Sequence, residues 1–287
     1  MYKIYEIEEK DQCYPQNLLK CAKHPKKLYV MGNKKILNNI CVVIVGSRDN
    51  TSYGETYASY FAKEISKEGI TIVSGLAKGI DTIAHRSSMC EKGGTIAVLG
   101  SGFNNIYPPE NKSLVYEIIK NGGAIISKYP PDKEINLANF PKRNEIIAGL
   151  GKCTIVIEAK YRSGSSITAR YTKEQDKPVF CLPGKIGSIT SRGTNNLIKE
   201  GANILTDVNQ IFELFGIEKT ESKNIQPIKI PAKYMQIYKL VEKKDMNTNE
   251  IARTLKLDIS EVYSKISMME LDGIIEILPG DVVKVKE

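Results

Sequence analysis

Residues 41–46 read CVVIVG, and Ser47 and Arg48 follow directly. The run is too short for a helix and does not alternate, which predicts a strand covered on both faces. Amphipathic helical segments separate it from comparable runs at TIVSG (71–75), TIAVLG (95–100), AIISK (124–128), TIVIEA (154–159), PVFCLPG (178–184) and NILT (203–206). This alternation predicts an α/β domain over residues 40–215, with a mostly parallel sheet and helices on both faces.

Three further segments flank this domain. Residues 1–39 are too short for an independent domain, and we expect them to pack on the sheet domain as a lead-in. Residues 216–231 are polar with two prolines, which is typical of a linker. Residues 232–287 hold three helical segments and a hairpin around Pro279-Gly280, which predicts a small winged-helix domain.

Composition argues against membranes and metals. No apolar run approaches the ~20 residues that span a bilayer. The N-terminal MYKIYEIEEKDQCYP lacks a signal-peptide pattern, so we expect a cytoplasmic protein. Six scattered cysteines without a Cys-x-x-Cys pair, and only two histidines, argue against a zinc site. The cysteines in ICVVIVG and KCTIVIEA are expected to be buried free thiols.

The positive charge is confined to one part of the chain. The net charge is +8, and residues 1–216 hold 29 basic and 21 acidic residues, whereas residues 217–287 hold 12 of each. A polyanion should therefore prefer the first part.

Loops that follow the predicted strands are rich in glycine, serine, lysine and arginine. In a parallel sheet, ligands bind at the carboxyl ends of the strands. Gly46, Ser47 and Arg48 can admit a phosphate, donate to it and pair with its oxygens. The alternative is a tight turn with a surface arginine. Neither G-x-G-x-x-G nor G-x-x-x-x-G-K-[ST] is present, so dinucleotide and P-loop binding lack their fingerprints.

SGLAKGID (74–81) follows the second strand. Its glycines, Gly75 and Gly79, can form a phosphate nest, with Ser74 and Lys78 beside them. Asp81 and His85 are spaced to meet on one helix face. An acid–base pair is conceivable, but a structural hydrogen bond is favoured because no nucleophile accompanies them.

NFPKRN (139–144) opens an apolar helix, EIIAGL. Pro141 suits the first helical turn, and Lys142 and Arg143 beside free helix N–H groups form a candidate anion site. Phe140 can stack on a base, as in single-strand binding, or it can fill the core. In YRSGSSIT (161–168), Arg162 and the hydroxyl groups again stand at a strand-to-helix loop, where Ser165, Ser166 and Thr168 can cap the helix, bind phosphate, or do both.

The predicted recognition helix of the C-terminal domain, SEVYSKISMMELDG, carries one lysine and three acids. Phosphate neutralisation drives binding to nucleic acid, so a protein or oligomer contact is favoured over duplex readout.

The motifs resemble one family. GSR, SGLAKGID, YPPEN, NFPKRNEIIAGL, VIEAKYRSGSSITA and MMELDGIIEILPG occur in the order seen in the DNA-processing protein A (Smf) family, over roughly residues 14–287. The resemblance implies an extended Rossmann-like domain, a C-terminal winged helix, sequence-independent binding of single-stranded DNA and frequent dimerisation. It also implies loading of a RecA-type recombinase during natural transformation, with no catalytic residues, cofactor or metal.

By motif, the resemblance implies a DNA pocket with Ser47, Arg48, Lys142 and Arg143, Phe140 as a stacking group and Lys112 nearby. With the loop residues above, the candidate DNA-binding residues are Gly46, Ser47, Arg48, Ser74, Gly75, Lys78, Gly79, Lys112, Phe140, Lys142, Arg143, Asn144, Arg162, Ser163, Gly164 and Ser165.

The sequence also allows two alternative functions and shows one difference from the family pattern. A nucleotide phosphoribohydrolase has a similar fold, but its P-G-G-x-G-T-x-x-E signature has no counterpart here. A winged-helix transcription regulator is disfavoured by the neutral recognition helix. Many family members carry an additional N-terminal helical domain, and we expect this chain to lack it because it begins almost at the YPQNLL segment.

Overall fold

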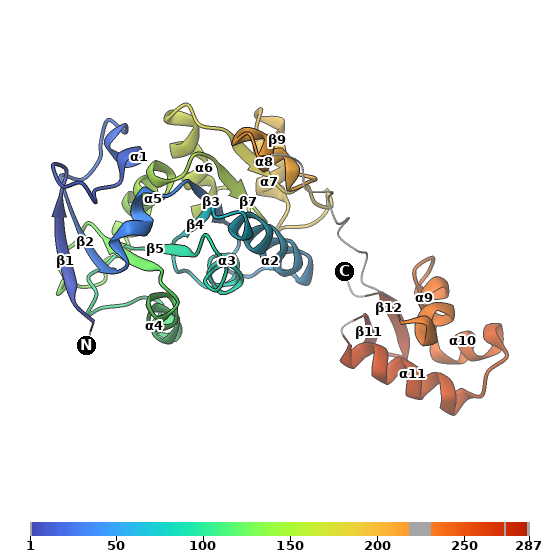
Figure 1. Ribbon diagram of the computed structural model, residues 1–287. Helices are drawn as coiled ribbons and strands as arrows, with labels where there is room; N and C mark the ends of the chain where they lie inside the picture. The colour runs from blue at the N-terminus through green and yellow to red at the C-terminus, as the bar shows by residue number, and fades with distance from the viewer. Residues whose placement is uncertain (1, 218–230, 273, 286–287) are drawn as a thin grey trace. The chain divides into compact units, whose positions relative to one another are not determined.

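The computed structural model describes residues 2–217, 231–272 and 274–285, which belong to two compact units (Figure 1). Unit 1 extends to residue 219 and unit 2 begins at residue 220. Most of the predicted linker, residues 218–230, lies outside the described residues.

Unit 1 is built on a nine-stranded sheet of order β1-β2-β6-β5-β4-β3-β7-β8-β9. Neighbouring strands from β6 to β9 are parallel, which confirms the predicted sheet. The strands are β1 (Ile4–Glu8), β2 (Lys27–Gly32), β3 (Cys41–Val45), β4 (Thr71–Ser74), β5 (Thr95–Leu99), β6 (Ala124–Ser127), β7 (Thr154–Val156), β8 (Val179–Cys181) and β9 (Asn203–Ile204).

The lead-in does more than pack on the sheet. Strand β2 pairs antiparallel with β6, and β1 pairs antiparallel with β2, so residues 4–32 extend the sheet by two strands. Leu28 and Val30 of β2 are fully buried. The open edge of β6 is thereby covered, which removes a site for aggregation.

Helices cover both faces of the sheet (Figure 1). Successive residues of β3 show this, since Val42 and Ile44 share a core with α2 and α3, whereas Val43 and Val45 share one with α5. One face carries α2 (Ser52–Lys67), α3 (Ile80–Ser88), α4 (Lys112–Lys120) and α8 (Asn209–Leu214). The other carries α1 (Gln16–Leu19), α5 (Asn139–Leu150), α6 (Gly164–Glu174) and α7 (Arg192–Lys199). Short 3-10 turns lie at η1 (Lys34–Asn38) and η2 (Pro109–Asn111).

The strand order reverses between β3 and β7. The chain steps outward from β3 through β4 and β5 to β6, and then returns to place β7 on the other side of β3. Helices α2 and α6 therefore leave neighbouring strand ends toward opposite faces. In open α/β sheets such a switch point leaves a crevice at the carboxyl ends of the strands, where ligands bind.

Unit 2 has the predicted three helices and hairpin. The helices are α9 (Met235–Val241), α10 (Thr248–Leu255) and α11 (Ile259–Leu271), preceded by η3 (Ala232–Tyr234). Strands β11 (Ile275–Leu278) and β12 (Val282–Val285) form the hairpin, and β10 (Met246–Asn247), which the sequence did not predict, pairs with β12. Val262, Ile266 and Met269 of α11 lie in the core, as their spacing predicts.

Candidate functional site

A cleft of about 490 Å³ lies at the switch point, and we call it the central cleft. The β3–α2 loop, the start of α5 and the β7–α6 loop meet there. Its lining includes nine of the predicted residues: Gly46, Ser47, Arg48, Phe140, Arg143, Asn144, Ser163, Gly164 and Ser165. A cavity of about 50 Å³ shares Arg48, Ala77, Phe140 and Arg143 with it and adds the predicted Gly75 and Lys78.

The other predicted residues lie outside these two linings. Ser74 is fully buried, and its hydroxyl donates to the Ile44 carbonyl (2.6 Å). Lys112 and Lys142 are exposed on α4 and α5. Gly79 packs on the loop that carries Arg48, and Arg162 lines a different cleft.

Arg48 is exposed at the mouth of the central cleft on a loop that the protein holds in place. Buried Glu158 follows β7 and accepts hydrogen bonds from the Thr51 N–H (2.8 Å) and hydroxyl (2.7 Å). Ser47 Oγ accepts the Asp49 N–H (3.2 Å). These bonds fix the chain on both sides of Arg48, so the guanidinium projects from a restrained backbone.

Glycine is required at position 79. Its φ is +73°, and an added Cβ would lie 2.4 Å from the Ser47 carbonyl oxygen. The Ile80 N–H donates to the same oxygen (3.1 Å). Gly79 therefore lets α3 approach the Arg48 loop and does not itself present a ligand site.

The predicted phosphate nest is occupied by the protein itself. The Gly75 and Ala77 N–H groups donate to Asp81 Oδ2, at 3.0 and 3.3 Å. A carboxylate early in α3 thus fills the position that the sequence assigned to a phosphate. The nest prediction is wrong, because these amide hydrogens satisfy a buried side chain of the same segment.

The prediction that Arg143 forms an anion site at the start of α5 is also corrected. Arg143 is only 5% exposed, and its Nη1 donates to the carbonyls of Gly75 (2.6 Å) and Val98. Burial lowers the pKa of Arg143 to about 10, which the charge of Asp81 opposes. Burial likewise raises the pKa of Asp81, opposed by Arg143 and by the two N–H donors. Arg143 therefore braces the strand ends and brings charge to the cleft floor instead of serving as an exposed ligand.

Phe140 is available to a ligand. It is partly exposed and lines both cavities, with its ring centroid 5.4 Å from that of Tyr107. The sequence analysis missed Tyr107, although it stands in the YPPEN loop that was singled out. Lys160, which was also missed, lines the central cleft and pairs with Asp49 (2.8 Å). The predicted Lys78 is likewise paired, with Glu110 (2.6 Å).

The β7–α6 loop is tied to its own helix and to α5. Ser163 is the N-cap of α6 and accepts the Ser166 N–H (3.4 Å), so a residue before the expected capping hydroxyls performs that role. Asn144 Nδ2 donates to the Gly164 carbonyl (3.1 Å). The start of α5 and the start of α6 are therefore joined at the cleft wall.

Asp81 and His85 have separate partners, which favours the structural interpretation. His85 is fully buried, and its Nδ1 lies 2.7 Å from Thr95 Oγ1. Cys41 and Cys153 are buried free thiols, as expected. Within residues 2–217, 231–272 and 274–285, no group of three His, Cys, Asp or Glu side chains is placed to hold a metal ion. Across the same residues, no helix combines the length and apolarity needed to span a bilayer.

Comparison with known proteins identifies the family. The model of the DNA recombination-mediator protein A family matches residues 6–216. The chain belongs to this family. By family the protein is a recombination mediator and not an enzyme, which removes the phosphoribohydrolase alternative.

Individual relatives agree with this family assignment. Protein Smf of Escherichia coli K12 is 35% identical over 98% of this chain and 77% of its own length. The X-ray structure of DNA processing protein A from Streptococcus pneumoniae is 38% identical, with a TM-score of 0.68 over 76% of each chain. DNA processing protein A from Helicobacter pylori is 30% identical, with a TM-score of 0.67 over 75% of this chain and 96% of that one. These structures confirm the predicted α/β fold.

Proposed function

We propose that the protein binds single-stranded DNA in the central cleft without sequence preference and delivers it to a RecA-type recombinase during DNA uptake. The observation that carries the proposal is the meeting of Arg48, Phe140 and the serine-rich β7–α6 loop in one cleft at the switch point. The Helicobacter pylori relative is described as having a single-stranded DNA binding mode, which supports the same ligand class here.

The chemistry of the cleft suits an unpaired strand. Arg48 and Lys160 can neutralise phosphates, while Phe140 and Tyr107 present partly exposed rings. Bases are free to stack on such rings only when they are not already paired and stacked in a duplex, and every base has a face to offer. Recognition by charge and stacking carries little sequence information.

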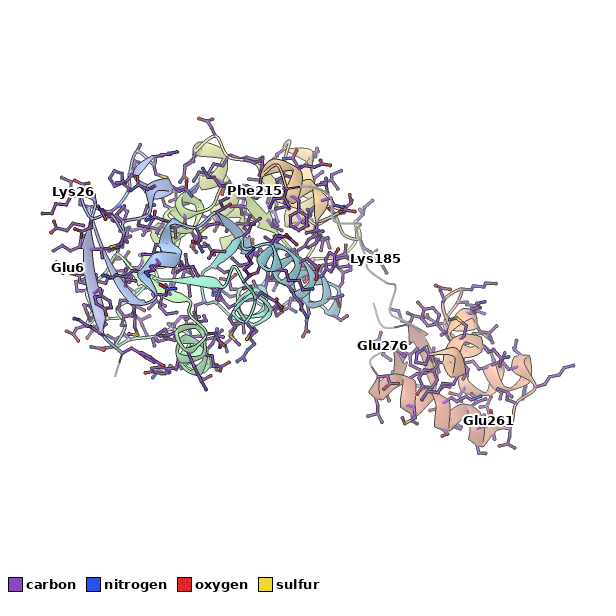
Figure 2. All side chains as sticks on the ribbon, in the orientation of Figure 1. Glu6, Lys26, Lys185, Phe215, Glu261 and Glu276 are labelled. Carbon is purple, nitrogen blue, oxygen red and sulfur yellow. The ribbon has the colours of Figure 1, made fainter. Side chains whose placement is uncertain are left out.

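We propose that protein partners bind at surfaces outside the central cleft. Homodimer formation and recombinase binding are proposed from the family resemblance. In unit 2, α11 and its C-cap carry one lysine against three acids, and Lys265 pairs with one of these acids, Glu261 (2.6 Å). Figure 2 labels Glu261 on this helix. The helix therefore has little net charge to offer DNA phosphates. We propose that unit 2 contacts protein rather than a DNA groove.

Replacing Arg48 and Lys142 together by alanine tests the proposed site, because Arg48 lines the central cleft and Lys142 is exposed next to the lining residue Pro141. Each phosphate contact on a single strand contributes about 0.7 to the slope of log affinity against log salt. We therefore expect the slope for oligo-dT to fall by about 1.4 and the affinity at about 0.1 M salt to fall roughly 25-fold. Fluorescence anisotropy across a salt series measures both quantities.

The matched control removes two exposed lysines of α2 and α4, Lys63→Ala with Lys120→Ala. It changes the net charge equally, and we expect a much smaller loss. Unchanged binding by the Arg48/Lys142 variant, or no oligo-dT binding by the wild type at low salt, would rule out the proposed site.

Asp49→Asn is expected to tighten binding. Asp49 pairs with Lys160 at the cleft mouth, and the hydrogen bond and charge of Lys160 lower the pKa of the Asp49 carboxyl group. A phosphate must compete with this carboxylate for Lys160. Exposed ion pairs are weak, so the gain should be at most about fivefold. Glu68→Gln, at the C-terminal end of α2, is the charge-matched control. Weaker binding by Asp49→Asn would contradict the competition.

A further inference from the structure

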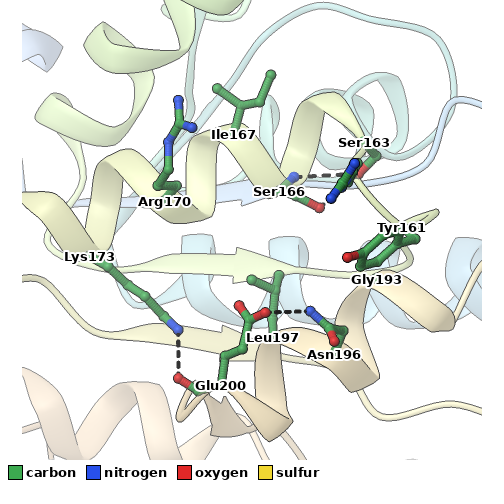
Figure 3. A pocket seen from close by; sticks show the side chains of 11 residues that line it. Tyr161, Ser163, Ser166, Ile167, Arg170, Lys173, Gly193, Asn196, Leu197 and Glu200 are labelled. Carbon is green, nitrogen blue, oxygen red and sulfur yellow. Dashed lines mark hydrogen bonds between the residues drawn. The ribbon is translucent and has the colours of Figure 1, made fainter.

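A second cleft lies beside the central cleft, with a volume of about 520 Å³, and we call it the outer cleft. Helix α6 and the loop before it form one side, and α7 forms the other (Figure 3). The sequence analysis placed only Arg162 and Ser163 of its lining among the candidate residues.

The two clefts adjoin and share part of their lining. Ser163 and Ile167 line both of them. These residues stand one helical turn apart at the start of α6. A ligand that extends from the central cleft into the outer cleft would therefore pass over Ser163 and Ile167.

The outer cleft is basic. Arg162, Arg170 and Lys173 line it, against one carboxylate among its described lining residues, that of Glu200. Lys173 Nζ donates to the backbone carbonyl of Glu200 (3.1 Å), which leaves its charge uncompensated by that bond. The Glu200 carboxylate accepts a hydrogen bond from Asn196 Nδ2 (2.7 Å).

Arg170 also retains most of its capacity for a ligand. It lies 3.5 Å from Glu174, and both side chains are more than half exposed, at 62% and 57%. Solvent screens an ion pair of this kind, and a phosphate can displace it at little cost.

An aromatic side chain also lines the outer cleft. Tyr161 precedes Ser163 by two residues, lines the outer cleft and is 59% exposed. The Arg162 guanidinium carbon lies 5.3 Å from its ring centroid. An exposed ring beside a row of cations is the arrangement that binds single-stranded nucleic acid by stacking and neutralisation.

We propose that the outer cleft binds the continuation of the single strand that occupies the central cleft. Arg162, Arg170 and Lys173 contact phosphates, and Tyr161 stacks on a base. This inference rests on the proposed function and adds a second segment to the DNA path, so the occupied site is longer than the central cleft. A short oligonucleotide reaches only the central cleft, whereas a longer one reaches both.

The test compares oligo-dT lengths from about 4 to about 16 nucleotides on the full-length protein, by anisotropy across a salt series. The variant is Arg170→Gln with Lys173→Gln, which keeps good helix formers on α6. For the longest oligonucleotide we expect the salt slope to fall by about 1.4 and the affinity at about 0.1 M salt to fall roughly 25-fold. For the shortest we expect no change. Tyr161→Ala should cost the longest oligonucleotide about fivefold or more and leave the shortest unaffected.

Other outcomes separate the two proposals. If the double variant binds every length as the wild type does, or loses all lengths equally, the outer cleft is not the continuation of the path. The same holds if Lys63→Gln with Lys120→Gln, the charge-matched control, loses the long oligonucleotide equally. If the wild type binds no length at all, the proposed function itself fails. If the double variant binds DNA normally but loses an acidic protein partner, the outer cleft is a protein site.

Discussion

Arg143→Met is expected to lower the free energy of unfolding of unit 1 by about 3–5 kcal/mol, because the change removes a buried donor to two carbonyls and the charge that opposes that of buried Asp81. Arg143 is 5% exposed, and its guanidinium joins the ends of β4 and β5 through the Gly75 and Val98 carbonyls. Its removal leaves the Asp81 carboxylate without the nearby positive charge and leaves two carbonyls without this donor. Thermal or urea denaturation of the full-length protein, followed through the unit 1 transition, measures the loss.

The neighbouring residue supplies the control. Lys142→Met removes one positive charge from the same helix turn but acts on an exposed side chain, so its effect should stay within about 0.5 kcal/mol. Arg143→Met with Asp81→Asn should recover part of the loss, since the unpaired charge is then absent. If Arg143→Met were as mild as Lys142→Met, Arg143 would not be a buried brace and would be restored as a free DNA ligand.

This pair of residues shows where sequence reasoning stops. Lys142 and Arg143 are adjacent in NFPKRN, and the sequence predicts the same anion-binding role for both. Successive helical residues point about 100° apart, so one faces solvent and the other faces the strand ends. Which of them turns inward depends on how α5 packs on the sheet, and that contact is not local in sequence.

The fold was largely predictable, for a related reason. Strands β3 to β8 are fully buried runs whose composition alone indicates a strand, and the alternation with helices fixes the parallel arrangement. The strands β1 and β2 were missed, because β2 is placed by pairing with β6, about a hundred residues later, and β1 is placed by pairing with β2. The switch point needs the strand order, which periodicity does not contain.

The site was predictable at the level of loops and less so at the level of atoms. Glycine, serine and arginine after β3, and serine after β7, reached the same cleft because the carboxyl ends of parallel strands share one edge. The nest at Gly75 failed, because the sequence does not reveal that Asp81 turns back to occupy it. Tyr107 became a candidate only through its contact with Phe140.

Acid should destabilise unit 1 through His85. Burial, together with a smaller contribution from the charge of Arg143, lowers the pKa of His85 from an ordinary value of 6.5 to about 3. Thr95 Oγ1 donates to the Ile72 carbonyl (2.8 Å), so it accepts from His85 Nδ1–H. Nε2 is then the unprotonated nitrogen, and it is buried without a hydrogen-bond partner among the described residues.

Proton linkage gives the direction in which folding stability changes with pH. Below about pH 6.5 the unfolded chain protonates this histidine while the folded protein does not, so stability falls as the pH falls toward 3. One pKa unit corresponds to about 1.4 kcal/mol, so lowering the pH from about 7 to about 4 should remove about 3 kcal/mol through His85 alone. Other titrating groups change stability over the same range, and a variant is needed to isolate this contribution.

His85→Asn isolates the effect, because the asparagine amide can donate to Thr95 as Nδ1 does but does not titrate. At pH 7 the wild type should be the more stable protein, and its advantage should shrink by about 3 kcal/mol at about pH 4. Urea denaturation of both proteins across this range measures the difference. His24→Asn, at a partly exposed histidine beside Glu9, is the control for the substitution itself. A constant difference between wild type and His85→Asn would mean that the folded protein protonates His85, and that the interior around α3 admits a charge.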